Sequence, residues 1–261
     1  MATAFDTQRP ALSPDEEAAL LNEIEKWVHK EVRPVVMKFD HDDEWPADLV
    51  QQMCDMGLFG ATIGQDYGGL GLPATTYAKI VALISSYWMA ITGIFNSHLI
   101  MAAAVERFGT PAQKARWLPK FATGEIRGGL ALTEPNAGTD LQAIRTTAVR
   151  DGDHYVINGT KTWISNGIQG QCFALLVKTD PKAEPRYKGM SMFPADYLIG
   201  EKEGQGFFQA TGGLELGRIN VAARGVGLAE GALRLATEYS KLRETMGKPI
   251  ADHQAIQLYL G

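Results

Sequence analysis

The stretch "ALTEPNAGTDLQAI", residues 131–144, decides how the rest of the chain is interpreted. It leaves an apolar segment and enters a loop that brings Thr133, Asn136, Gly138 and Thr139 together. A surface turn needs only Gly, Asn or Pro, so this density of small residues and hydroxyl groups needs another explanation. Small side chains allow a ligand to approach the backbone closely. The loop therefore predicts a binding site for an anionic or flat polar ligand.

A second window, "TKTWISNG", covers residues 160–167. We expect Trp163 and Ser165 to lie on the same face of a strand, because they are two residues apart. An indole beside a hydroxyl suits a flat aromatic ring whose edge carries hydrogen-bonding nitrogens. The alternative is that Trp163 belongs to the sheet core and that Ser165 only precedes the Asn166–Gly167 turn. The dipeptide pattern alone favours this alternative, whereas the two windows together favour a ring-binding site.

The composition is that of a globular protein with one large domain or two ordinary ones. The chain has 261 residues, of which 45% are hydrophobic and 21% charged. A net charge of −5 and the lack of any long Lys/Arg block argue against nucleic-acid binding. Cys54 and Cys172 are the only cysteines, so neither a disulfide framework nor a metal site is expected. The first residues do not resemble a signal peptide, and a cytoplasmic location is expected.

The longest apolar run is "KIVALISSYWMAITGIFNSHLIMAAAVERFG", residues 79–109. Polar residues interrupt it, among them Ser85, Ser86, Asn96 and His98, so we expect no membrane span. A helix buried in a helical bundle explains the run better. His98 could be a ligand or a base, but a core histidine that is satisfied by a neighbour is the more ordinary interpretation.

Three regions with different periodicity predict an α+β protein. Residues 1–128 are expected to form an N-terminal helical bundle, with a capping box at Ser13, a helix end at Pro34 and a last helix opened by Thr110. Residues 129–203 alternate and carry turn dipeptides, which predicts an antiparallel β-meander. Residues 204–261 are expected to begin a C-terminal helical bundle, in which Ala and Gly mark close packing.

Common nucleotide and hydrolase motifs are missing from the sequence. "GGLGLP" does not match the Rossmann fingerprint, and neither a phosphate-binding P-loop, an H-E-x-x-H zinc motif nor a G-x-S-x-G elbow occurs.

One resemblance covers both windows. Residues 130–167, "LALTEPNAGTDLQAIRTTAVRDGDHYVINGTKTWISNG", resemble the flavin-binding signature of the acyl-CoA dehydrogenase family. The likeness continues through "RFGTPAQKARWLPKFATGE" upstream and "LELGRINVAARGVGLAEGAL" and "RETMGKPIADHQAIQ" downstream. It therefore covers essentially the whole chain, and it implies FAD as the cofactor.

The resemblance also assigns binding residues. Within the chain, those implied for FAD are Leu130, Leu132, Thr133, Thr139, Trp163, Ile164 and Ser165. Four more would reach the FAD of a neighbouring subunit in a homotetramer or dimer, namely Arg243, Thr245, His253 and Gln254. Thr139, Glu215 and Arg218 would lie near the acyl-CoA, and Arg218 matches an arginine that begins a long helix beside the thioester.

The family implies α,β-dehydrogenation of an acyl-CoA thioester to the 2-enoyl-CoA, a reaction of fatty acid metabolism. A glutamate removes the α proton while the β hydrogen leaves as hydride to the flavin, and an electron-transferring flavoprotein takes up the electrons. Hydrogen bonds to the thioester carbonyl stabilise the enolate-like charge. Two alternatives stay open: an acyl-CoA oxidase-like flavoenzyme, and a non-catalytic protein that binds flavin or acyl-CoA without a base.

Two departures from the family pattern change the activity that we expect of this chain. Most members place the glutamate in a region that would follow Gly261, and a minority place it directly before the arginine matched by Arg218, where this chain has Gly217. Glu215 is not assigned as the base because it lies on a different helical face. "PADYLIGEKEGQGF" also follows "KGMSMF" without the usual further strands. We therefore expect an incomplete chain that binds FAD weakly or not at all and turns over no acyl-CoA.

Overall fold

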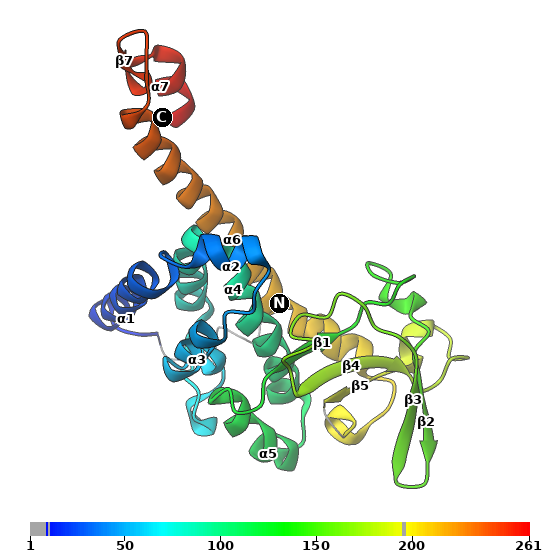
Figure 1. Ribbon diagram of the computed structural model, residues 1–261. Helices are drawn as coiled ribbons and strands as arrows, with labels where there is room; N and C mark the ends of the chain where they lie inside the picture. The colour runs from blue at the N-terminus through cyan, green and yellow to red at the C-terminus, as the bar shows by residue number, and fades with distance from the viewer. Residues whose placement is uncertain (1–8, 10, 195–196) are drawn as a thin grey trace.

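The computed structural model describes residue 9 and residues 11–194 and 197–261. Helices form one side of the molecule, a small sheet forms the other, and one long helix runs past both (Figure 1). The expected α+β class, with helices before and after a central sheet, is confirmed.

The N-terminal helices begin and end where the sequence places breakers. They are α1 (Pro14–Trp27), a π-helical turn (Val28–Val32), α2 (Val36–Asp42) and α3 (Ala47–Asp55). Ser13 and Glu16 form the predicted capping box of α1. Pro34 lies in the turn before α2. Gly57 follows α3 with a φ of 75°, a conformation that glycine adopts without strain.

The apolar run forms α4 (Ala74–Phe108), which bends at Trp88, where the backbone is non-helical. A capping box at Thr110 then starts α5 (Pro111–Ala122). By length and hydropathy alone, α4 could cross a membrane, but half of its most apolar window is buried inside the protein. Its neighbours are α1, α5, the long helix α6 (Gly206–Leu242) and the first strand. Its place in the fold is that of a core helix.

The central sheet has five strands in the order β1-β4-β2-β3, with β5 paired to the other side of β4. Their bounds are β1 (Gly128–Ala131), β2 (Thr147–Asp151), β3 (His154–Asn158), β4 (Cys172–Lys178) and β5 (Met190–Pro194). The sheet is mixed, because β4 runs parallel to β1 and β2. The expected antiparallel meander was therefore wrong in detail. Turn dipeptides predict hairpins such as β2–β3, but they say nothing about how separate strands pair.

The β2–β3 hairpin joins the rest of the sheet through a single residue pair, Thr147 with Lys178. Val149, Val156 and Ile157 on this hairpin remain exposed. Between β5 and α6, the described residues 197–205 contain a 3-10 turn, Ile199–Glu201, and no strand. This agrees with the expected shortage of strands between these two elements.

The long helix α6 packs against α4 along a line of glycines. A Cβ atom at Gly227 would lie 2.1 Å from the Ala82 carbonyl oxygen, and one at Gly231 would lie 2.3 Å from that of Ser86. Only glycine lets two helix backbones approach this closely. The sequence expectation that Ala and Gly mark close packing is confirmed.

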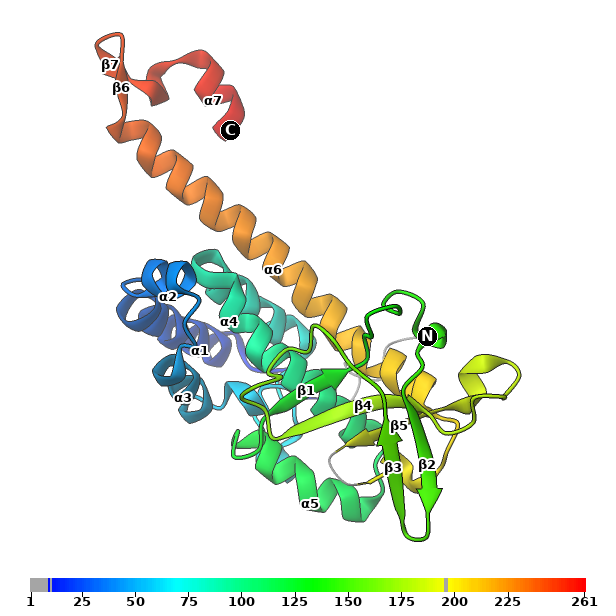
Figure 2. The same ribbon diagram turned by 45° about the vertical axis from the view of Figure 1, so that its right-hand side comes forward.

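Beyond α4, the end of α6 projects away from the sheet and carries a small hairpin and α7 (Gln254–Leu260) (Figure 2). The hairpin consists of β6 (Glu244–Thr245) and β7 (Lys248–Pro249). At 37 residues, α6 is about 55 Å long.

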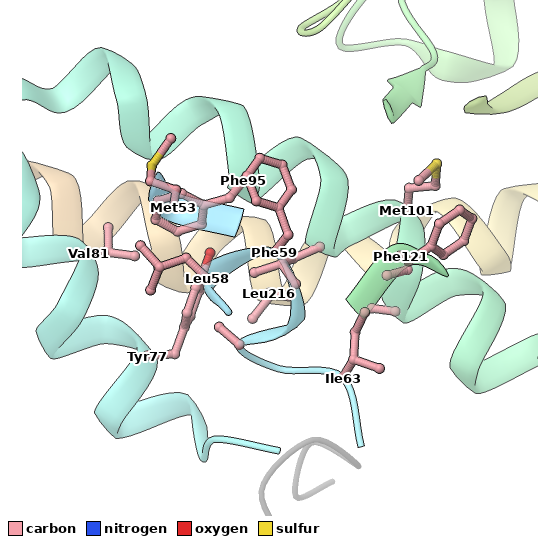
Figure 3. Packing of buried hydrophobic residues seen from close by; sticks show 14 of the residues in the cluster. Met53, Leu58, Phe59, Ile63, Tyr77, Val81, Phe95, Met101, Phe121 and Leu216 are labelled. Carbon is pink, nitrogen blue, oxygen red and sulfur yellow. The ribbon is translucent and has the colours of Figure 1, made fainter. Parts of the chain in front are cut away.

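Buried apolar side chains from α3, α4, α5 and α6 form the main core (Figure 3). His98 lies inside it, fully buried between the rings of Phe59 and Phe121. Its Nε2 lies 3.0 Å from the Phe121 carbonyl oxygen. Burial lowers the pKa of His98 to about 4, so the imidazole is neutral at pH 7. The interpretation of His98 as a core histidine is confirmed.

Candidate active site

The two windows that the sequence analysis singled out lie side by side. The Thr162 backbone N–H donates to the Thr133 carbonyl at 2.9 Å, and the Lys161 ammonium donates to the Leu132 carbonyl at 2.9 Å. The segment after β1 and the loop after β3 therefore form one surface, although almost thirty residues separate them in the chain.

A buried ion pair holds this surface together. Lys161 Nζ lies 2.9 Å from Glu134 Oε1, and both side chains are less than 10% exposed. The same carboxylate accepts hydrogen bonds from the backbone N–H groups of Arg145 and Thr146. Burial alone would raise the pKa of Glu134, but the hydrogen bonds from Thr146, Arg145 and Lys161 outweigh it and lower the pKa to about 2. Glu134 is therefore ionised at pH 7.

Sequence reasoning missed this pair. Glu134 also closes the loop itself, because its backbone exchanges two hydrogen bonds with Ala137 across Pro135 and Asn136. A signal was present in the sequence: Glu134 is a lone acid three residues after the apolar segment that ends at Ala131, and Lys161 stands two residues before Trp163. Such isolated charges are buried only when they are paired.

Asn166 fixes the other end of the Trp163 loop. Its Nδ2 donates to the Ile94 carbonyl of α4 at 2.9 Å and to the Gly128 carbonyl of β1 at 2.8 Å. Its φ of 64° places it in the left-handed region that asparagine tolerates. The loop is thus held at Lys161 and at Asn166, with Trp163 between the two.

Trp163 does not lie on a strand, which corrects the expectation. β3 ends at Asn158, and Trp163 has a φ of 57°, so it and Ser165 belong to an irregular loop. The indole is 90% exposed and is therefore not part of the sheet core either. Alternation along a strand could not predict a loop whose path is set by Lys161 and Asn166.

A pocket of about 570 Å³ lies beside the Trp163 indole. Its lining is mostly apolar, with Lys161 and Gln171 as the polar long side chains. The residues that line it are Ala131, Ile157, Lys161, Trp163, Ile164, Gly167, Gln171, Cys172, Phe173, Leu175 and Phe193. A mostly apolar pocket lined by an exposed indole suits a flat ring.

The other residues that the resemblance implies for FAD within the chain differ in burial. Leu130 belongs to β1, and its backbone N–H donates to Ser97 Oγ at 3.3 Å. Leu132 is buried, whereas Thr139 and Ser165 are exposed. Of the whole set, Trp163 and Ile164 line the pocket directly.

Arg243, Thr245, His253 and Gln254 lie at the far end of α6, on the hairpin and α7, well away from the sheet (Figure 2). They therefore cannot meet the pocket of their own chain. This position agrees with the expectation that they serve a neighbouring subunit, which stays a prediction.

Glu215, Gly217 and Arg218 lie within α6. Arg218 is exposed and lies well inside α6, which begins at Gly206, so the expectation that it begins a long helix was wrong. Its place near the acyl-CoA stays a prediction. Gly217 is buried, and a Cβ atom there would lie 2.7 Å from Ile100 Cδ1. Glu215 pairs with Arg107 of α4 at 3.4 Å. The catalytic base therefore stays unassigned.

Among the residues that the structure describes, no group of three His, Cys, Asp or Glu side chains is placed to hold a metal ion.

Models of three domains match the chain in order. The N-terminal domain of acyl-CoA dehydrogenase matches residues 14–125, the middle domain matches residues 129–226 and the C-terminal domain matches residues 204–261. The chain belongs to the acyl-CoA dehydrogenase family. The flavin-signature windows both fall in the match to the middle domain.

Individual relatives are longer than this family member. (2S)-Methylsuccinyl-CoA dehydrogenase of Cereibacter sphaeroides is 31% identical over 283 residues, which cover 91% of the chain and 52% of the relative. That alignment is longer than the 261 residues of the chain, so the relative carries extra residues inside the matched span. Acryloyl-CoA reductase (NADH) of Anaerotignum propionicum is 35% identical over 269 residues, which cover 88% of the chain and 67% of the relative.

The solved structure of a glutaryl-coenzyme A dehydrogenase in complex with glutaryl-CoA has the same fold. It matches with a TM-score of 0.90 and 29% identity over 96% of this chain and 72% of that one.

Proposed function

We propose that this chain binds FAD and acyl-CoA and takes part in the α,β-dehydrogenation of an acyl-CoA thioester. The observation that carries the proposal is the joined surface of residues 131–139 and 160–167, with an exposed indole beside an apolar pocket. Exposed tryptophan is costly in water, and stacking against a flat ring would remove that cost.

The residues present fit a flavin. When bound, FAD supplies the acceptor for the hydride that leaves the β carbon of the substrate. The Trp163 indole would cover one face of its ring system, and Thr133 and Ser165 would offer hydroxyl groups to its polar edge. The carbonyl groups of Leu132 and Thr133 already accept hydrogen bonds from Lys161 and Thr162. The groups of this segment that remain for a ligand are therefore N–H and hydroxyl donors. The Lys161–Glu134 pair would fix the position of the indole.

The relatives suggest the substrate class and the partners. Their names give methylsuccinyl-CoA, acryloyl-CoA and glutaryl-CoA as ligands, so the CoA thioester is common and the acyl group varies. We propose a homo-oligomer in which Arg243, Thr245, His253 and Gln254 approach the FAD of a neighbour. An electron-transferring flavoprotein is the proposed electron acceptor.

The second candidate function is binding of flavin or acyl-CoA without a catalytic base, and Gly217 favours it. A side chain at this position would meet Ile100 of α4. No carboxylate replaces it on this face of α6, since Glu215 pairs with Arg107. A polypeptide of these 261 residues is therefore expected to perturb a bound flavin on addition of acyl-CoA without reducing it.

A fluorescence titration tests the proposed function. Adding FAD to the 261-residue protein is expected to quench the emission of Trp163 in a saturable way. Butyryl-CoA should then shift the visible flavin spectrum without bleaching it.

Trp163→Leu should remove most of the saturable quenching. Ile168→Ala changes an equally exposed residue in the same loop and should leave the quenching intact. If FAD causes no saturable quenching in the unmodified protein, FAD binding is refuted. If the protein dehydrogenates acyl-CoA with a dye as electron acceptor, the second candidate, which lacks a catalytic base, is refuted.

A further inference from the structure

The β2–β3 hairpin has one edge that the rest of the sheet leaves open. β1 packs against α4 and β5 against α6, whereas β3 is the last strand of the sheet among the described residues. The two-residue turn makes Asp151 and His154 a hydrogen-bonded pair, so alternate residues of β3 bond to β2. The N–H and C=O groups of Tyr155 and Ile157 therefore point away from β2, and no hydrogen bond between described residues uses them.

Two contacts hold this edge in place. On the face toward the protein, the Tyr155 ring meets the Phe193 ring of β5 edge to face, with centroids 4.9 Å apart. The Tyr155 hydroxyl donates to Glu203 Oε1 at 2.5 Å. The hairpin projects from the sheet (Figure 2), and these contacts fix its position. A fixed strand with unused backbone groups is a template for pairing with another strand.

The opposite face of the hairpin is apolar and open to solvent. Val149 and Val156 are cross-strand partners on this face, and they are 60% and 45% exposed. Proteins usually protect an exposed strand edge with charged side chains or proline. The sequence of β3, "HYVIN", contains no Asp, Glu, Lys, Arg or Pro. The edge of β3 therefore lacks the usual protection against pairing.

Charges of opposite sign lie at the two ends of the hairpin. Asp151 and Asp153 stand at the turn, with side chains 74% and 103% exposed. At the open end, exposed Arg145 lies two residues before β2, and Lys178 of β4 pairs with the first residue of β2. Two hairpins that lie antiparallel bring each turn beside the open end of the other. Opposite charges then meet at both ends of the pair.

We propose that two copies of this chain pair through their β3 edges, antiparallel and about a two-fold axis at Val156. Tyr155 of each copy would exchange two hydrogen bonds with Ile157 of the other, so this register uses all the outward backbone groups of both strands. Val149 and Val156 of both copies would form one apolar row across the joined sheets. An edge of five residues buries little surface, so the dimer is expected to be reversible.

This surface is separate from the oligomer contact proposed above. Residues 243–254 lie at the far end of α6, on the other side of the molecule from the β2–β3 hairpin (Figure 2). The inference therefore goes beyond the proposed function and does not depend on FAD or acyl-CoA.

Cross-linking through introduced cysteines tests the pairing. Val156→Cys would face its own copy in a non-hydrogen-bonded pair, with Cα atoms about 4.5 Å apart and within reach of a disulfide. The 261-residue protein with this change is expected to form a disulfide-linked dimer under mild oxidation. Cys54 and Cys172 are buried, so the unmodified protein gives the background.

Val149→Cys is the matched control for cross-linking. Position 149 lies on the same face of the hairpin and is more exposed than position 156. Three strand spacings would separate it from its counterpart, about 14 Å, which is too far for a disulfide. It is expected to cross-link roughly tenfold less than Val156→Cys under the same conditions.

Sedimentation of a dilution series gives a readout without oxidation. The unmodified protein is expected to dimerise as its concentration rises. Val156→Lys and Val156→Glu should each require a roughly tenfold higher concentration, because each places like charges directly opposite one another. An equimolar mixture of the two variants should dimerise again. Met37→Lys, an exposed change on α2, should behave as the unmodified protein does.

Three results would overturn the inference. They are equal cross-linking at positions 149 and 156, an unmodified protein that stays monomeric, and association that both charged Val156 variants keep. Association of the last kind belongs to another surface, such as residues 243–254. FAD binding is measured separately, so each of these results leaves the proposed function standing.

Discussion

Gly227→Ala is expected to destabilise the protein by about 3 kcal/mol, the upper end of the usual cost of overpacking. The added Cβ would lie 2.1 Å from the Ala82 carbonyl oxygen and 3.0 Å from the Ala82 Cα. Both contacts are with backbone, so no side chain can rotate away, and α6 would have to move off α4. Chemical denaturation followed by circular dichroism measures the change in the free energy of unfolding.

Gly225→Ala is the matched control, two residues earlier in the same helix. Nothing lies within 4 Å of a Cβ atom at Gly225, which faces solvent. This variant should be more stable by about 0.5–1 kcal/mol, because alanine favours a helix over glycine. If both variants were equally stable, the close contact between the backbones of α4 and α6 would be wrong.

Glu134→Gln is expected to cost about 3 kcal/mol or more at pH 7, since it leaves the Lys161 ammonium buried without its partner. Lys161→Met should cost a similar amount, because it leaves the carboxylate buried. Both changes also remove one of the contacts that hold the Trp163 loop against residues 132–134, so FAD binding should weaken in parallel. Denaturant titration of each single variant and of the double variant measures the coupling between the two side chains.

The same pair predicts an acid dependence with a definite sign. The pKa of Glu134 is about 2 in the folded protein and near 4.5 in the unfolded chain. The unfolded state therefore binds the proton more tightly, and the stabilisation is complete above about pH 4.5 and lost as the pH falls towards 2. In Glu134→Gln, this part of the pH dependence should disappear. An unchanged slope between these pH values would contradict the role given to Glu134.

Glu23→Gln serves as the control for both experiments. Glu23 pairs with Lys26 at 2.7 Å, but both side chains are more than 60% exposed. Exposed pairs of this kind contribute little to stability. This variant should therefore match the unmodified protein at pH 7.

Local signals in the sequence predicted the helices well. The caps at Ser13 and Thr110 and the break at Pro34 each depend on residues within a few positions of one another. The Ala and Gly residues of α6 likewise marked its contact with α4. The class of fold and the position of the flavin-signature windows could therefore be predicted from the chain alone.

Features that depend on distant partners could not be predicted in the same way. β4 pairs in parallel with β1 although more than forty residues separate them in the sequence, and nothing in the sequence of either strand predicts this pairing. The Trp163 loop follows a path set by Lys161 and Asn166, whose partners lie in other elements. Long-range geometry decides each of these features.

Photolabelling with an azide-substituted FAD tests most directly whether the flavin lies between the segments around Thr133 and Trp163. The 261-residue protein is illuminated with the analogue, and the labelled peptides are identified by mass spectrometry. We predict labelling in residues 128–139 and 160–173, suppressed by excess FAD and reduced in Trp163→Leu. Labelling that excess FAD suppresses elsewhere in the chain, with both of these segments unlabelled, would contradict the account.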